Sequence, residues 1–270
     1  MRCERQRDGR GLPPANRWNA HKVMTAVRSP EFPVSGSARG ILDVERIDTW
    51  VFDLDNTLYH PRANLFGQID QRMTAFIMEL LALDAVAARA LQKRYFLEYG
   101  TTLHGLMHYH GVEPRRFLDY VHDIDLTVVG PDAALRRALA ALPGRKLVFT
   151  NGDAPYARRV LDRLGVADHI EAIHDIVATD YVPKPHEAPY DQLLAEHGIN
   201  ARRAVFVEDM ARNLLPAKAR GMATVWVNNG SEKGGFGASP DYIDLEITDV
   251  AAWLSGIGLE GIALTPAPAS

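Results

Sequence analysis

The sequence predicts an α/β protein with a Rossmann-like parallel sheet and an inserted, all-helical domain. Two observations lead to this fold class. After residue 143, short apolar runs alternate with segments of helical period, which is the rhythm of right-handed βαβ units. Before that point, residues 63–142 carry helical patterns only, and they follow a first strand-like run. The core is therefore expected to be discontinuous in sequence, from 45 to 62 and from 143 to 256.

The elements follow in order along the chain. The first is a strand over 47–54, an apolar run short enough to be buried on both faces of a sheet. Breaks at Gly and Pro divide the inserted block into helices over 65–83, 85–99, 101–110, 114–121 and 132–141. Strands are then expected at 146–150, 172–178, 204–207 and 224–227, and helices at 155–164, 186–197, 211–220 and 248–254. Residues 230–237 are predicted to form a Gly-rich loop.

Composition and charge exclude several classes of protein. With 47% hydrophobic and 24% charged residues, the 270-residue chain can bury a substantial core. A net charge of −4 gives no basic footprint for nucleic acid, and no apolar run reaches the ~18 residues of a membrane span. The single cysteine, Cys3, excludes a disulfide framework within one chain. We therefore expect a cytoplasmic monomer or homodimer with no nucleic-acid or membrane partner.

Both ends of the chain are expected to lie outside the folded domains. Residues 1–44 form a basic segment whose low hydrophobicity and high charge are typical of disorder. The segment lacks the apolar stretch of a secretory signal, which leaves three alternatives: translation that starts at Met24, an organelle transit peptide, or a nucleic-acid-binding arm. Residues 257–270 are predicted to be a flexible tail rich in Pro and Ala.

Two carboxylates follow the first predicted strand. Asp53 and Asp55 are two positions apart, so on an extended backbone they lie on the same side. Open parallel sheets bind ligands beyond the carboxyl ends of their strands, which is where this pair lies. Mutual repulsion favours a bound cation, and Mg²⁺ typically uses one or two protein carboxylates together with water and phosphate oxygens. The alternative role for such a pair is the capping of a turn or helix.

Polar groups also follow the later strands. Thr150 and Asn151 precede Gly152, which allows backbone N–H groups to approach an anion closely. Lys184 lies between two prolines, which restrict the direction of its ammonium group. An acidic pair and an amide follow the strand at 204–207, namely Glu208, Asp209 and Asn213. Each group alone has an ordinary structural role, but together they form a complete set for Mg²⁺-assisted phosphoryl transfer through an aspartyl-phosphate.

In sequence order, these residues resemble the four motifs of the haloacid dehalogenase (HAD) superfamily over about 47–227: Asp53-x-Asp55-x-Thr57, Thr150, Lys184 and Glu208-Asp209-x-x-x-Asn213. The resemblance implies a HAD-like core and a helical cap that closes over the site. It implies that Asp53 is the nucleophile and Asp55 the general acid/base. It further implies phosphate ligands and a Mg²⁺ site: Thr150, Asn151 and Lys184 for phosphate, and Asp53, the Asp55 carbonyl and Asp209 for the metal. Glu208 and Asn213 are expected to act behind the ligands or through water.

Three stretches resemble the pyrimidine 5′-nucleotidase branch of this superfamily, at 52–59, 98–106 and 149–153. That resemblance implies hydrolysis of nucleoside monophosphates, with Tyr59, Tyr99 and His104 as candidate substrate contacts. Asp55 and Thr57 depart from the dehalogenases themselves and argue against carbon–halogen cleavage. The alternatives are a phosphatase for phosphoglycolate or a sugar phosphate, a phosphomutase, and a catalytically silent sensor of a phosphorylated metabolite.

Two further patterns are interpreted as structural. Asp123-x-Asp125-x-Thr127 repeats the first motif but follows a helical stretch, so it is expected to be the exit turn of the insertion. His104 and His108 are four positions apart on a predicted helix, yet no acidic ligand lies near them in sequence, so no zinc site is expected there. The aromatic residues of the insertion are expected to form its core, with stacking on a base as the alternative; these are Phe66, Tyr95, Tyr99 and Tyr109.

Overall fold

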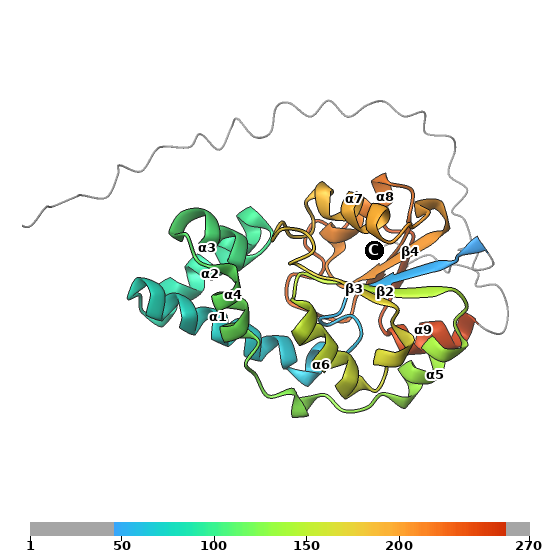
Figure 1. Cartoon of the computed structure of the whole chain (residues 1–270), viewed down its shortest axis with the longest axis horizontal. Coiled ribbons are helices and arrows are strands. Elements are labelled where there is room, and N and C mark those ends of the chain that lie inside the picture. The colour runs from blue at the N-terminus through green and yellow to red at the C-terminus, as the bar shows by residue number, and fades with distance from the viewer. Residues whose placement is uncertain (1–45, 258–270) are drawn as a thin grey trace, which may run out of the picture. The chain divides into compact units, whose positions relative to one another are not determined.

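The computed structural model describes residues 46–257, so the predictions for 1–44, for Cys3 and Met24, and for 258–270 lie outside the described residues. Within the described range, six parallel strands form one sheet in the order β3-β2-β1-β4-β5-β6 (Figure 1). The strands are β1 (Thr49–Phe52), β2 (Arg145–Phe149), β3 (Ala172–His174), β4 (Ala204–Glu208), β5 (Ala223–Val227) and β6 (Leu245–Ile247). The predicted α/β class with a parallel sheet is confirmed.

The register of the central strands determines which side chains meet beyond the sheet. All residues of β1 and β4 are buried, as expected for strands covered on both faces. Phe52, the last residue of β1, pairs with Val148 of β2 and with Val207 of β4. The chain therefore leaves β1 between the ends of β2 and β4, and residues that follow these three strands meet at one edge.

Helices cover both faces of the sheet (Figure 1). On one face lie α5 (Ala133–Ala141), α6 (Ala154–Leu164) and α9 (Val250–Ile257), and Trp50 of β1 contacts Trp253 of α9 edge to face at 6.1 Å. On the other lie α7 (Glu187–Glu196) and α8 (Leu214–Ala219), packed on Val51, Leu147 and Phe206. Two apolar clusters result, one on each side of the sheet.

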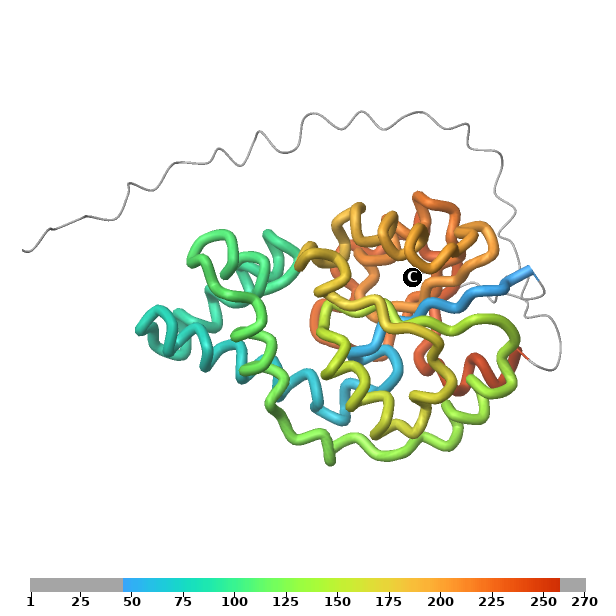
Figure 2. Tube along the Cα trace, viewed as in Figure 1, coloured from blue at the N-terminus to red at the C-terminus, as the bar shows by residue number. Residues whose placement is uncertain are grey.

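Four helices form the inserted domain: α1 (Leu65–Leu81), α2 (Ala85–Tyr99), α3 (Thr102–His110) and α4 (Pro114–Val121). Figure 2 traces the chain from β1 into these helices and back to β2. Side-chain caps explain where three of them begin, because Asp84, Thr101 and Glu113 accept hydrogen bonds from backbone N–H groups of the first turn. Gly100 and Gly111 end α2 and α3 at positive φ, a conformation that glycine adopts without a steric penalty.

Helix α5 lies within the range 63–142 that was predicted as the cap, yet it packs against α9 on the sheet (Figure 1). Its buried face carries Leu135, Ala138 and Leu139, and Arg136 forms an ion pair with Asp168 beside α6. The helical period of a sequence shows which face of a helix is buried, but it does not show which domain that face packs against. The packing of α5 could therefore not be predicted. The short edge strand β6 was also missed, and β3 ends at His174 instead of residue 178.

No helix in the range 46–257 combines the length and the apolar character needed to cross a lipid bilayer.

Candidate active site

The predicted site residues converge at the carboxyl edge of the sheet. Asp53 directly follows β1, and its N–H donates a hydrogen bond of 2.8 Å to the Val207 carbonyl of β4. Thr150 follows β2 and is held by a 3.1 Å bond from its N–H to the His174 carbonyl of β3. Glu208 ends β4 and Asp209 comes next. The sheet register thus gathers groups that are more than 150 positions apart in sequence.

Lys184 is a fixed, fully enclosed ammonium group. Its side chain is 1% exposed, and Nζ lies 2.8 Å from Asp53 Oδ1 and 2.7 Å from Glu208 Oε2. A third bond of 2.8 Å goes to the Phe149 carbonyl, so all three N–H donors are used. Burial lowers the pKa of Lys184, but the carboxylates of Asp53 and Glu208 raise it by more, and the net shift is upward. The ammonium therefore stays charged.

Asn151 has a supporting role beside its predicted contact with phosphate. Its Oδ1 accepts a 2.9 Å bond from the N–H of Lys184, and its Nδ2 donates a 3.3 Å bond to the Lys184 carbonyl. The amide also lines the cavity described below. Asn151 thus holds the loop that carries the lysine, which the sequence did not indicate.

Thr57 connects the first motif with the last. Its hydroxyl donates to Asp53 Oδ2 at 3.0 Å and accepts from the N–H of Asp209 at 3.1 Å. Each partner is thereby held in one orientation. The threonine of the Asp-x-Asp-x-Thr pattern was the only sequence signal for this link.

Three buried carboxylates, Asp53, Glu208 and Asp209, have ligand oxygens within 4.8 Å of one another. Burial and Glu208 raise the pKa of Asp53 to about 7, and burial, Glu208 and Asp53 raise the pKa of Asp209 well above its usual range. The Lys184 ammonium pairs with two of the three carboxylates, Asp53 and Glu208, and hard oxygen ligands of this kind fit Mg²⁺. Glu208 also accepts a bond from the N–H of Met210, and Asp53 also accepts one from Thr57, so each of these two carboxylates has hydrogen-bond partners on both oxygens.

This electrostatic balance predicts how the metal affects stability. In the metal-free folded protein the pKa of Asp53 is about 7, whereas in the unfolded chain it has its ordinary value of 3.8. Between these two pH values the folded protein keeps a proton on Asp53 that the unfolded chain releases. Stability without metal should therefore fall as the pH rises from about 4 to about 7. Because bound Mg²⁺ needs ionised carboxylates, Mg²⁺ should raise the melting temperature more at about pH 8 than at about pH 5. Thermal melts with Mg²⁺ or with EDTA test this prediction. If Mg²⁺ raises the melting temperature equally at both pH values, the prediction is contradicted.

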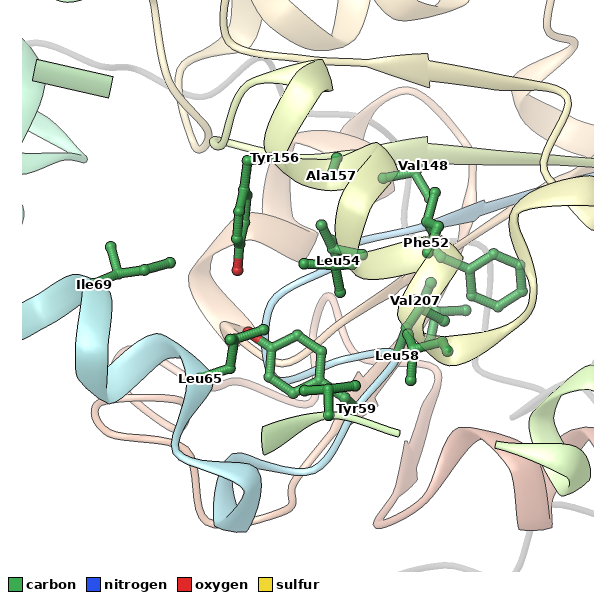
Figure 3. Packing of buried hydrophobic residues seen from close by; sticks show 14 of the residues in the cluster. Phe52, Leu54, Leu58, Tyr59, Leu65, Ile69, Val148, Tyr156, Ala157 and Val207 are labelled. Carbon is green, nitrogen blue, oxygen red and sulfur yellow. The ribbon is translucent and has the colours of Figure 1, made fainter. Parts of the chain in front are cut away.

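Asp55 lies in a separate hydrogen-bond network. Its Oδ1 accepts two bonds of 2.6 Å, from the hydroxyls of Tyr59 and Tyr156. Figure 3 shows both rings with their hydroxyl groups turned toward the same space. Burial raises the pKa of Asp55, and the two tyrosine hydroxyls partly oppose this effect. A carboxyl group with a raised pKa can hold a proton near neutral pH and release it, which is what a general acid/base requires.

Tyr156 is itself held by groups that reach into the inserted domain. The ring of His122 stacks on it with centroids 4.2 Å apart, and His122 Nδ1 lies 3.0 Å from Asp153 Oδ1. The other oxygen of Asp153 pairs with Arg115 of α4 at 3.2 Å. A continuous series of contacts therefore links Arg115 in the inserted domain to Asp55 in the core.

Replacement of Tyr156 by Phe tests this network. Loss of one charge-assisted hydrogen bond of about 1.5–3 kcal/mol should lower kcat by roughly 10- to 100-fold and raise the pKa of Asp55 in the pH–rate profile. Tyr120→Phe is the matched control, since that hydroxyl bonds Glu79 at the surface. An unchanged rate and profile in Tyr156→Phe would show that the tyrosine does not support Asp55.

A cavity of about 160 Å³ opens above these residues, between the core and the inserted helices. Its floor includes Asp53, Asp55, Thr150 and Lys184. Its upper wall is largely apolar and comes from α1, α2 and α4, with Phe66, Ile69, Met73, Phe96 and Phe117 among the lining side chains. The inserted helices therefore form one wall of the cavity that Asp53, Asp55, Thr150 and Lys184 also line.

The three predicted substrate contacts, Tyr59, Tyr99 and His104, are not among the residues that line this cavity. Tyr59 bonds Asp55 from below the site. Tyr99 bonds the hydroxyl of Tyr109 and stacks on His108, and the ring of His104 lies 5.5 Å from that of His186. Similarity of a sequence stretch places these residues near the cap, but the direction of each side chain depends on helix packing that the stretch does not encode.

Arg212 is a cavity residue that sequence reasoning missed. Its guanidinium lies over the Phe96 ring at 4.3 Å and donates to the Gly100 carbonyl at 3.2 Å, while its Nε is buried without a partner in the described chain. Asn213 next to it is buried as well, and its backbone carbonyl accepts a 2.6 Å bond from the Tyr190 hydroxyl. The sequence signal that could have identified Arg212 is its place within the last motif, three residues after Asp209.

The second Asp-x-Asp-x-Thr sequence lies on the surface. Asp125 caps a short 3-10 helix, η3 (Leu126–Val128), and bonds the N–H and hydroxyl of Thr127. Arg72 pairs with the exposed carboxylate of Asp123. This pattern is a turn at the exit of the insertion, as its context predicted.

The fold and site together define a haloacid dehalogenase-like hydrolase. The family model of that description matches residues 47–221, which is more than half of the chain, and the chain belongs to this family.

Three curated relatives illustrate the range of similarity. The chain is 32% identical to phosphoglycolate phosphatase of Rhodospirillum rubrum over 195 residues, covering 67% of this chain and 79% of that protein. It is 27% identical to phosphate metabolism protein 8 of Saccharomyces cerevisiae over 217 residues, covering 74% of this chain and 64% of that protein. With the phosphoglycolate phosphatase of Yersinia pseudotuberculosis, the match covers 49% of that protein. The chain thus spans about half to two thirds of the length of these last two relatives.

Solved structures share the fold at low identity. A HAD phosphatase from Thermococcus onnurineus superposes with a TM-score of 0.54 at 16% identity, covering 80% of this chain and all of that one. The L-2-haloacid dehalogenase of Xanthobacter autotrophicus gives a TM-score of 0.50 at 15% identity, covering 79% of this chain and all of that one.

Proposed function

We propose that this protein is a Mg²⁺-dependent phosphomonoester hydrolase that works through an aspartyl-phosphate at Asp53. The observation that carries the proposal is the buried ammonium of Lys184, which bridges Asp53 and Glu208 beneath the cavity. A Mg²⁺ held by Asp53 and Asp209 would neutralise phosphate oxygens and the carboxylates around them. The buried cluster of three carboxylates supports this metal, as described above.

The chain's own groups account for both chemical steps. In the first, a carboxylate oxygen of Asp53 forms a bond to phosphorus, the phosphorus–oxygen ester bond breaks, and the proton of Asp55 passes to the leaving oxygen. In the second, the ionised Asp55 takes a proton from water, which attacks phosphorus and releases phosphate from Asp53. The three N–H donors of Lys184 already have partners, so its positive charge acts on the phosphoryl oxygens through the electrostatic field, while Thr150 offers its hydroxyl. The inserted helices exclude bulk water.

We propose nucleoside monophosphates as the substrate class, as in a pyrimidine 5′-nucleotidase. The lining of the cap supports this, because Phe66, Phe96 and Phe117 give aromatic surface on which a base can stack. Thr101 supplies a polar group in the same lining for the edge of a base.

Phosphoglycolate is a second candidate, and a specific observation favours it. Arg212 presents a half-buried guanidinium to the cavity with its Nε buried and unpartnered in the described chain, a group suited to a substrate carboxylate. The names of the bacterial relatives agree with this candidate.

A substrate panel with Mg²⁺ separates the two. Wild type and Arg212→Met are assayed for phosphate release from UMP, CMP, AMP, phosphoglycolate and a sugar phosphate, with Arg72→Met as a surface control. The nucleotidase proposal expects UMP and CMP to have the highest kcat/KM, and expects that Arg212→Met does not change this ranking. The second candidate expects phosphoglycolate to rank first and its KM to rise by about 10-fold or more in Arg212→Met. Binding of the panel without any turnover would overturn both.

A further inference from the structure

A second group of side chains of the types that ligate metals lies on the sheet face that α7 covers, and the proposed phosphatase chemistry does not use it. His174 ends β3 and pairs in register with Phe149 of β2. Glu196 ends α7, and His197 follows it. The ligand atoms of His174, Glu196 and His197 all lie within 4.8 Å of one another.

Three ring nitrogen atoms of this cluster are buried without a hydrogen-bond partner in the described part of the chain. His174 is 0% exposed, and neither of its ring nitrogens has a hydrogen-bond partner in the described chain. Nε2 of His197 is likewise buried and unpartnered within residues 46–257. His174 Nδ1 comes to 3.3 Å from Glu196 Oε2 without forming a hydrogen bond. Each unsatisfied buried polar group costs about 1–3 kcal/mol, so a shared ligand for these atoms would remove a substantial penalty.

We propose that His174, Glu196 and His197 bind one transition-metal ion of the Zn²⁺ class, at a site distinct from the acidic cluster of Asp53. Two imidazoles and one carboxylate are a ligand set that Zn²⁺ accepts, with water in the remaining position. The all-oxygen cluster at the active site suits Mg²⁺ instead. The Glu196 side chain is 56% exposed, so the site has access to solvent for water and for metal exchange.

The surrounding backbone supports a cation at this point. The carbonyl end of α7 carries the negative end of the helix dipole. Arg145 donates a 2.7 Å bond to the His197 carbonyl, and the N–H of His197 donates to the Leu193 carbonyl at 3.2 Å, so the end of the helix is held in place. A metal bound here would fasten α7 to β3, a strand of three residues at the edge of the sheet.

Cobalt(II) is the probe, because its visible absorption reports nitrogen ligands and does not depend on phosphatase activity. The tag-free full chain is titrated with Co²⁺ in excess Mg²⁺, which occupies the active site, and Zn²⁺ is then added. We expect one Co²⁺ per chain, intense visible bands, displacement by Zn²⁺, and a higher melting temperature with Zn²⁺.

Variants at the exposed end of α7 locate the site. His197→Ala and Glu196→Gln should each weaken Co²⁺ binding by more than about 100-fold, since even the outer partners of metal ligands are worth about 10- to 100-fold. His108→Ala in the cap and Asp209→Asn in the acidic cluster should leave it unchanged. Circular dichroism checks that each variant is folded. Absence of one-to-one binding in the wild type, or binding that survives both α7 variants, or binding that is lost in His108→Ala or Asp209→Asn, would overturn the proposal, whatever the outcome of the phosphatase assays.

Discussion

Asp53→Asn should lower phosphate release by on the order of 10⁴-fold or more, the loss expected when a covalent nucleophile is removed. The amide cannot form the acyl-phosphate, and its one oxygen can take the place of only one of the two carboxylate oxygens that accept from Thr57 and from Lys184. Stability should respond differently. Burial and Glu208 raise the pKa of Asp53 to about 7, so the charge is unfavourable in the metal-free fold at neutral pH and its removal should not destabilise the protein.

The surface repeat of the motif supplies a matched control. Asp123→Asn changes the residue at the position of the pattern that corresponds to Asp53, but Asp123 is exposed, pairs with Arg72 and does not line the cavity. It should retain the activity of the wild type. Phosphate release and urea unfolding are measured for both variants. If Asp53→Asn keeps more than about one hundredth of the activity, Asp53 is not the nucleophile.

Lys184→Met should cause the largest loss of stability. The ammonium is the group that compensates two carboxylates at 2.7 and 2.8 Å, and its removal leaves those charges buried. Breaking a buried ion pair from one side costs about 3–5 kcal/mol, so the free energy of unfolding without metal should fall by about that much. Activity should also be lost, because the phosphoryl oxygens lose their fixed cation.

A second substitution separates lost charge from lost packing. If the penalty is electrostatic, Glu208→Gln in the Lys184→Met background should recover part of the stability, since it removes one of the two uncompensated charges. Added Mg²⁺ should stabilise Lys184→Met more than it stabilises the wild type. Urea denaturation of the single and double variants gives both numbers. A double variant that is less stable than Lys184→Met alone would show that the cost is one of packing.

Sequence reasoning predicted the fold class because apolar runs, helical periods and strand-end motifs all indicated the same sheet. It also predicted which side chains meet at the sheet edge, since Asp53, Thr150 and Asp209 follow strands whose parallel order places their ends together. These assignments need only local pattern and topology.

The remaining features depend on packing between distant segments. Tyr156 lies 101 positions from Asp55, and nothing in its helix distinguishes it from an ordinary core aromatic residue. The packing of α5 on α9, and the contacts of Tyr99 with Tyr109 and of His104 with His186, also depend on which surfaces meet in three dimensions. Arg212 is intermediate, because its place beside the last motif was visible while its contact with the cap was not.

A series of contacts from Arg115 through Asp153, His122 and Tyr156 to Asp55 makes the orientation of the proton donor depend on the position of α4. Arg115 belongs to the cap, whereas Tyr156 and Asp55 belong to the core. Any opening movement that withdraws α4 would remove one end of this series and loosen the tyrosine that orients the proton donor. We therefore expect Asp55 to transfer its proton only while the substrate is enclosed. In the open state, the protein would bind substrate and release product without catalysing the reaction.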